Sequence, residues 1–291
     1  MDALLTALGI ALVLFGLIDA FQTLLHPSGE GPLARRVLGI VWRVSRLSRH
    51  RFGSLAGPLA GVAIVGSWTL LQVFGWALIY LPHVPEGFAY ATGIEPTRFN
   101  AFSESLYVSL VTLSTLGFGD VVATEPSIRT FTPLEAVAGF GLLTATITWF
   151  TQVHNPVARS RALALRLTLL KRANYARDLD RSEPIAVSSA LQQLSADVIQ
   201  VRVDLTQIPD SYFFRDADPS TSLAHSIGYS SEISGAARVS PSATVRQAGE
   251  LLQDTLDDLA GCLQRRFLRG GGSTEDVFRR YAIDHGHYPG R

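Results

Sequence analysis

The chain of 291 residues has a formal net charge of +0, and 47% of its residues are hydrophobic while only 17% are charged. Most soluble domains carry a larger charged fraction, so the composition argues against a wholly soluble protein. The single cysteine, Cys262, excludes a disulfide within the chain and a cysteine-based metal cluster. Its apolar helical surroundings favour a small buried hydrophobic residue over a redox role.

The apolar residues are unevenly distributed along the chain. Long uncharged runs fill the first half, whereas the second half has the mixed pattern of a soluble protein. We therefore expect a membrane domain at residues 1–156, ending at His154-Asn155-Pro156, and a soluble domain at residues 157–291.

Residues 3–25 form the first run long enough to cross a bilayer, which needs about 20 residues. The run has no positively charged start and no clear cleavage pattern, so it predicts a retained helix and not a signal peptide. It contains one acid, Asp19. Since an acid inside a span is costly, we expect a pair with an arginine of the next segment, with a proton or ion relay as the alternative.

A basic segment follows at residues 35–51. Its apolar residues recur at helical spacing, and arginines occupy the other faces. This pattern predicts a basic amphipathic helix at the membrane surface, and a solvated charged connector is the alternative.

Residues 55–81 and 131–153 are the second and third expected spans. Between them, residues 100–113 are apolar but too short to cross, which predicts a re-entrant helix with Asn100 as its cap and Glu104 in its first turn. In the third span, Gly139 and Gly141 either form a gating hinge or allow close helix packing. Glu135 is either solvated or braces the segment before the span.

The loop charges predict how the chain crosses the membrane. Residues 26–54 carry six arginines and one glutamate, whereas residues 82–130 carry two arginines and five acids. Because positively charged loops stay in the cytoplasm, we expect a multi-pass protein of the cell membrane with its N-terminus outside and residues 157–291 in the cytoplasm.

The most informative string is Thr115-Leu116-Gly117-Phe118-Gly119-Asp120, which lies between the second and third spans. Its glycines permit backbone torsions that let consecutive carbonyls point at one axis, and a carbonyl ring can replace the water around a cation. The string resembles the T-V-G-Y-G-D filter of potassium channels. Residues 107–114 resemble the pore helix of that superfamily, and residues 121–124 resemble the strand that leaves a GFGD-type filter of two-pore-domain channels.

The resemblance covers residues 57–153 and implies an all-α membrane protein. Its pore domain would comprise an outer helix, a re-entrant pore helix, a filter and an inner helix. The resemblance does not extend to the other parts, where the apolar run at residues 3–25 predicts one extra transmembrane helix before the pore and the helical pattern after residue 156 predicts a helical cytosolic domain. Potassium would be the permeating ion, with no cofactor, no enzymatic activity and no nucleic-acid partner. The residues implied to bind the ion are Thr115, Leu116, Gly117, Phe118 and Gly119, with Asp120, Tyr107 and Thr112 as filter support.

One chain supplies one filter strand, and a carbonyl ring needs about four strands, so we expect a homotetramer in a lipid membrane. Two residues depart from the family pattern, because Leu116 replaces a common Val and Phe118 replaces a common Tyr. A weakly selective cation channel is therefore one alternative. The other is a non-conducting membrane anchor for a sensor or partner-binding module.

The soluble half has a helical pattern at residues 159–180, 186–208 and 240–268, and a last short helix ends at about residue 285. Residues 209–240 are expected to be irregular and to contain short pieces. Ser273 or Thr274 can cap that last helix. No nucleotide-binding fingerprint or phosphate loop is present, and the ligand or partner of this half stays open. For Tyr212-Phe213-Phe214 we favour core packing over a pocket floor, and for His285 and His287 we favour solvation over metal ligation.

Overall fold

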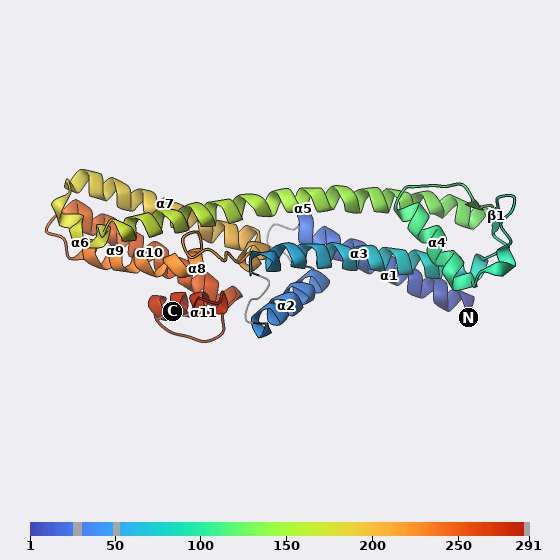
Figure 1. Ribbon diagram of the computed structural model, residues 1–291, viewed down its shortest axis with the longest axis horizontal. Coiled ribbons are helices and arrows are strands. Elements are labelled where there is room, and N and C mark those ends of the chain that lie inside the picture. Colours follow the sequence, from blue (N-terminus) through green and yellow to red (C-terminus); the bar gives the residue numbers. More distant parts are fainter. Residues whose placement is uncertain (26–30, 49–52, 288–291) are drawn as a thin grey trace. The chain divides into compact units, whose positions relative to one another are not determined.

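The computed structural model describes residues 1–25, 31–48 and 53–287, and most of these residues are helical (Figure 1). The chain divides into two compact units. The first comprises Met1–Leu38 and Gly61–Phe150, and the second comprises Gly39–Ala60 and Thr151–Arg291. Parts of the predicted basic segment, residues 49–51 among them, lie outside the described residues.

Three of the described helices are long and apolar enough to cross a membrane. They are α1 (Asp2–Leu25), α3 (Ala56–Tyr80) and α5 (Pro126–Arg172). The three predicted spans are therefore confirmed in length and composition. Many of their large apolar side chains are exposed, which suits helices whose solvent is lipid.

Glycines bring α1 and α3 close together. A Cβ added at Gly9 would lie 2.5 Å from the Gly75 carbonyl oxygen, and one added at Gly75 would lie 2.7 Å from Val13. The Gln72 side chain then donates to the Val13 carbonyl oxygen at 3.0 Å. Small residues at the contact and an interhelical hydrogen bond are the usual means of packing helices in a membrane.

Asp19 of α1 caps the start of α2 (Pro32–Leu47). Its carboxylate is buried and accepts hydrogen bonds from the backbone amides of Leu33 at 2.7 Å and Ala34 at 3.2 Å. The indole of Trp68 donates a third bond at 2.8 Å. Within the described residues, two amides of a helix N-terminus, whose partial positive charge stabilises an anion, and one indole bind Asp19 in place of the expected arginine.

Two short strands connect the loops that flank the short apolar helix α4 (Ala101–Leu113). β1 (Phe88–Tyr90) pairs antiparallel with β2 (Val121–Ala123). A helix and a strand therefore form at the residues expected for them on either side of the glycine-containing string, and whether the helix is re-entrant stays a prediction.

The second unit is a helical assembly in which α10 packs against α7, α9 and α11 (Figure 1). The helices after α5 are α6 (Tyr175–Asp178), α7 (Pro184–Gln207), α8 (Leu223–Ser226), α9 (Gly228–Arg238), α10 (Ala243–Arg266) and α11 (Thr274–Asp284). Short 3-10 helices occur in both units: Leu81–His83 and Pro96–Arg98 in the first, and Gly53–Leu55, Leu179–Arg181 and Pro209–Phe213 in the second. Leu191 and Leu194 of α7 and Leu252, Leu256 and Leu259 of α10 are fully buried at helical spacing.

The division into units differs from the expected boundary at residue 156. The helix α5 continues through Pro156 without interruption to Arg172, and residues 39–60 belong to the second unit. Two contacts explain this arrangement. Arg159 makes a bidentate pair with the buried Asp204 of α7, with both N–O distances 2.6 Å, and Trp42 packs 6.0 Å from the Tyr212 ring between centroids.

The stretch expected to be irregular contains the helix α9. Its sequence has few large apolar residues, but Tyr229, Ile233 and Ala237 at four-residue spacing form a buried face. The buried Ser230 satisfies its hydroxyl within the chain by donating to the Ile227 carbonyl oxygen at 2.5 Å. A serine-rich segment can therefore form a packed helix here.

Several side chains of the second unit test the sequence predictions. Ser273 forms a capping box with Asp276 at the start of α11, and Cys262 is buried, as predicted. Tyr212 is buried in the core, where its ring stacks on Phe267 at 4.1 Å. The predicted solvation of His285 is wrong, because its ring is buried 4.9 Å from the Tyr212 ring.

Candidate functional site

The helix α4 begins at the predicted cap. The Asn100 side chain accepts a hydrogen bond from the Phe102 amide at 2.8 Å, and Glu104 lies in the first turn. The Asn100 carbonyl oxygen accepts a further bond from the Ser103 hydroxyl at 2.7 Å. These bonds fix the start of α4. At its other end, α4 ends at Leu113, and the glycine-containing string begins two residues later at Thr115.

The string has an unusual backbone. Thr115, Gly117 and Gly119 have positive φ angles of 59°, 55° and 74°, whereas Leu116 and Phe118 between them do not. For a β-branched residue such as Thr115 this torsion costs about 1–3 kcal/mol, and such outliers gather at functional sites. The segment therefore alternates between left-handed and ordinary torsions over five residues.

Within one chain, Gly117 and Gly119 are required by their positive φ angles and not by a close neighbour. A Cβ added to Gly117 or Gly119 would meet nothing within 4 Å. Leu116 and Phe118 are also 62% and 65% exposed in the single chain. Within one chain, the string thus has few neighbours of its own.

Asp120 connects the end of the string to the helix α4. Its carboxylate accepts hydrogen bonds from the Tyr107 hydroxyl at 2.5 Å and from the Val121 amide at 3.0 Å. Its carbonyl oxygen accepts a bond from the Ala91 amide at 2.8 Å. At the other end, the Thr112 carbonyl oxygen accepts from the Thr115 amide at 2.9 Å. The structure thus brings Tyr107 and Asp120 together, and Thr112 participates through its main chain.

Glu135 holds the helices behind the string together. It is fully buried, and it accepts hydrogen bonds from the Tyr80 hydroxyl at 2.6 Å and from the Ser109 hydroxyl. Ser109 also lies 3.0 Å from the Val73 carbonyl oxygen. Of its two expected roles, the contacts favour bracing over solvation, since they link α3, α4 and α5. Sequence reasoning missed Tyr80 and Ser109, although an acid near a span signals that a partner is needed.

The two glycines of α5 have different environments. A Cβ at Gly139 would lie 1.9 Å from the Leu113 carbonyl oxygen, at the end of the pore helix. A Cβ at Gly141 would meet nothing within 4 Å. Gly139 is therefore required for the close approach of α5 to α4, and only Gly141 lacks a packing reason.

The threonines below these glycines bond to their own helix. The hydroxyls of Thr144, Thr146 and Thr148 donate to carbonyl oxygens four residues earlier, at 2.7–3.0 Å. This pattern removes the need for partners on other helices. Trp149 packs closely against the opposite helix, because a Cβ at Gly61 would lie 2.4 Å from its ring.

Glu125, in the loop before α5, pairs with the histidine His83. Glu125 lies 2.6 Å from the Nδ1 atom of His83 and accepts a bond from the Ser127 hydroxyl at 2.8 Å. The bond from Ser127 and the one shared with His83 hold the pKa of Glu125 below its ordinary value. Glu125 therefore adds negative charge to this loop at neutral pH.

The string offers main-chain carbonyl oxygens and the Thr115 hydroxyl as oxygen ligands. Among the residues that the structure describes, no group of three or more His, Cys, Asp or Glu side chains could hold a metal ion. Backbone carbonyls coordinate dehydrated monovalent cations, and the torsions at residues 115–119 are compatible with such a role.

Comparison with known proteins places an ion-channel match over the same part of the chain as the glycine-containing string. Residues 66–154 match the family model Ion_trans_2, described as an ion channel, and this range includes α4, the string and the first part of α5. The chain is similar to YdjJ, an uncharacterized membrane protein of Bacillus subtilis (strain 168), at 29% identity over 160 residues. That alignment covers 54% of this chain and 46% of the relative, so the chain spans less than half of that protein. No solved structure matches the chain. The protein is thus a multi-pass membrane protein in which the family match supports an ion-channel domain at residues 66–154.

Proposed function

We propose that four copies of this chain form a potassium-selective channel that conducts passively across the cell membrane. The observation that carries the proposal is the alternation of torsions at residues 115–119, directly after a helix too short to cross a bilayer. The positive φ angles permit successive carbonyl groups to point to one side of the strand, which is the arrangement that a cation-binding carbonyl ring needs. Four such strands around one axis would offer rings of oxygens in place of hydration water.

In this proposal the carbonyls of Thr115, Leu116, Gly117 and Phe118 coordinate potassium, and the Thr115 hydroxyl adds an inner site. Gly119 lets the chain turn out of the filter, and its φ of 74° is suited to that role. The bond between Tyr107 and Asp120 holds the outer end of the filter to the pore helix.

The need for neighbours supports a homotetramer. Irregular backbone at membrane depth is tolerated only when it is buried in protein or lines water. The string is exposed in one chain, and α5 has a row of exposed apolar side chains. That row consists of Leu134, Val137, Phe140, Leu143, Ile147 and Phe150. At about 100° per residue, these six side chains spread over more than half of the helix circumference, which suits contact both with other copies and with lipid.

The proposal includes the orientation derived from the loop charges, with the N-terminus outside and the second unit in the cytoplasm. The C-terminal end of α4 then carries partial negative charge and faces the water-filled cavity below the filter, where it attracts a cation. To test this orientation, a cysteine is introduced at the N-terminal or the C-terminal end and labelled with a membrane-impermeant reagent from one side of the membrane. The native Cys262 is buried, so it should add little labelling of its own.

The direct test is a flux assay on purified protein in liposomes. We expect potassium current from a particle with the mass of four chains, and a bi-ionic reversal potential that favours potassium over sodium. Tetrameric protein without any cation flux would contradict the proposal and favour the non-conducting anchor.

The absence of a hydroxyl on Phe118 motivates the alternative of a weakly selective cation channel. In this chain the side chain is 65% exposed, so it has little packing to hold the filter width. A reversal potential near zero in the bi-ionic assay would select this alternative. A matched Phe118→Tyr variant then shows whether a hydroxyl restores discrimination.

A further inference from the structure

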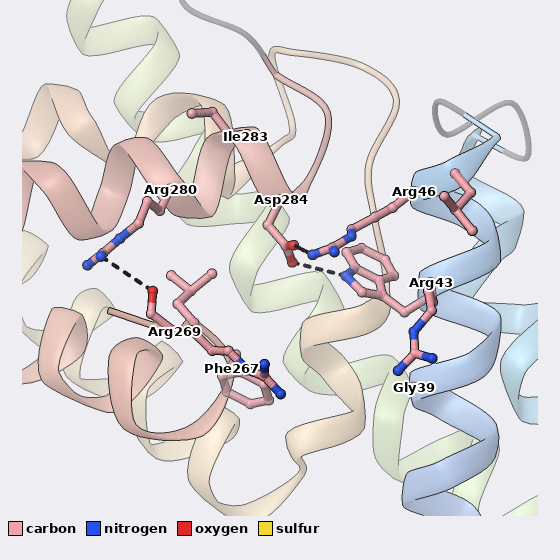
Figure 2. A pocket seen from close by; sticks show the side chains of 11 residues that line it. Gly39, Arg43, Arg46, Phe267, Arg269, Arg280, Ile283 and Asp284 are labelled. Carbon is pink, nitrogen blue, oxygen red and sulfur yellow. Dashed lines mark hydrogen bonds and ion pairs between the residues drawn. The ribbon is translucent and has the colours of Figure 1, made fainter. Parts of the chain in front are cut away.

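The second unit contains a pocket that the pore does not use. It has a volume of about 830 Å³ and lies between α2, α11 and the segment that follows α10 (Figure 2). Small-molecule sites usually measure about 300–1,000 Å³. Eleven residues line it, all within the second unit.

Positive charge dominates the lining. Arg43, Arg46, Arg269 and Arg280 face the pocket together with a single acid, Asp284. Arg46 already pairs with Asp284 at 2.7 Å. Figure 2 shows Arg43 on α2 and Arg269 beyond α10 among the side chains of the pocket; the dashed line at Arg269 reaches its main-chain oxygen, and none is drawn from the guanidinium group of either residue. The four arginines and one aspartate therefore give the lining a net formal charge of +3.

Arg280 gives the second indication of a missing anion. Its Nη1 atom donates to the carbonyl oxygens of Gly271 at 3.0 Å and Arg269 at 3.4 Å. Its Nε and Nη2 atoms are buried and have no hydrogen-bond partner within the described residues. Buried donors without acceptors are rare and costly, so an acceptor from outside these residues is expected.

The rest of the lining is apolar. Trp42 and Leu47 of α2, Phe267 and Leu268 beyond α10, and Ile283 of α11 supply this surface. Leu47 and Ile283 are 79% and 41% exposed, so part of the apolar surface is open. A small charged ligand without an apolar part would leave these apolar side chains in contact with water.

We propose that this pocket binds a phosphate-bearing ligand with an apolar body. The phosphate oxygens accept hydrogen bonds from Arg43, Arg269 and Arg280, and the apolar body covers Phe267 and Leu47. Phosphate suits the site better than a carboxylate, because three guanidinium groups offer more donors than two oxygens accept. This chemistry could come from a lipid headgroup or from a soluble phosphate ester.

The test measures binding to the full-length protein in phosphatidylcholine nanodiscs and does not depend on ion conduction. In the soluble arm, adenosine triphosphate is titrated by calorimetry. In the lipid arm, phosphatidic acid is mixed into the nanodiscs and its retention by the protein is counted by native mass spectrometry. Saturable binding in the first arm identifies a soluble source, and selective retention in the second identifies a lipid.

The decisive variant is the double substitution Arg43→Ala/Arg269→Ala. Both side chains are exposed, so their loss should leave the fold intact. We expect the affinity in whichever arm is positive to fall at least tenfold. The matched control is Arg265→Ala, which removes an exposed arginine of the same unit outside the pocket, and it should change the affinity less than twofold.

Two outcomes would overturn the proposal. One is the absence of saturable or selective binding in both arms. The other is an equal loss of affinity in Arg265→Ala and in the double variant, because binding would then reflect general surface charge.

Discussion

The two units of this chain are built by opposite rules. In the first unit, large apolar side chains such as Val137 and Phe140 are exposed, and polar groups such as Asp19 and Glu135 are buried with hydrogen-bond partners. In the second unit, leucines such as Leu256 are buried, and ion pairs such as that of Arg181 with Asp178 lie at the surface. The difference follows from the solvent, because lipid requires internal satisfaction of polar groups whereas water rewards apolar burial.

The same contrast separates their functional features. The first unit relies on main-chain torsions at residues 115–119, so changing side chains there should matter less than changing φ. The second unit presents side-chain charge in a pocket. Substitutions that act on torsion, core volume, charge and helix approach can test this contrast.

The largest expected effect comes from Gly117→Ala in every subunit. A Cβ at φ 55° is strained although it would meet no neighbour, so potassium flux should fall at least a hundredfold while the tetramer persists. Liposome flux and native mass spectrometry measure the two quantities. The control is Gly66→Ala, whose Cβ also meets nothing but whose torsion is ordinary, and a normal flux in Gly117→Ala would contradict the filter.

A core substitution should affect the second unit next most strongly. Leu256 is fully buried in α10, so Leu256→Ala should lower the free energy of unfolding by about 2–5 kcal/mol. Leu251 lies on the same helix at 45% exposure, and Leu251→Ala should change stability by less than half of that. Thermal unfolding in detergent compares them, and equal losses would mean that α10 does not bury the face described.

A charge substitution in the same unit should give a pH-dependent effect. Burial would raise the pKa of Asp284, but hydrogen bonds from Tyr212, Arg46 and Trp42 together with nearby His285 outweigh it, so the pKa lies below its ordinary value. The carboxylate therefore contributes stability above the unfolded-state pKa of about 3.9, and this contribution is lost as pH falls through the lower folded-state value.

Asp284→Asn should consequently cost about 1.5–3 kcal/mol at pH 7, the usual value of hydrogen bonds to a charged group. The difference from the unchanged protein should shrink as the pH falls below about 4. Differential scanning fluorimetry from pH 3 to pH 8 measures it. A difference that stays constant over that range would show that Asp284 acts by shape and not by charge.

The smallest effect should distinguish the two glycines of α5. Gly139→Ala pushes α5 away from the Leu113 carbonyl oxygen, so it should destabilise the first unit by about 1–3 kcal/mol and reduce flux through the displaced pore helix. Gly141→Ala meets no atom and should leave stability unchanged. If Gly141→Ala nevertheless alters channel opening, its role is bending. Equal melting temperatures for both variants would contradict the packing role of Gly139.

Much of the fold could be predicted from local sequence. The lengths of the apolar runs gave the three spans, and Asn100 and Ser273 marked helix starts because a cap acts on amides two or three residues away. Gly117 and Gly119 also predicted the positive φ angles that they adopt, because glycine permits them, whereas residue type did not predict the positive φ of Thr115. Where the pattern was weak, as in α9, a serine-rich helix was expected to be irregular.

The sequence by itself thus determined which long segments are helical, which are apolar enough for lipid, and where the backbone needs glycine. The tertiary structure decided the partners of the buried polar groups, such as Asp19 with the start of α2, Glu135 with Tyr80, and Trp42 with Asp284 across 242 positions of sequence. It also gathered the arginines of α2 and α11 around one pocket. Torsions and apolar periodicity are set over a few residues, whereas a buried donor finds its acceptor only once distant helices have packed.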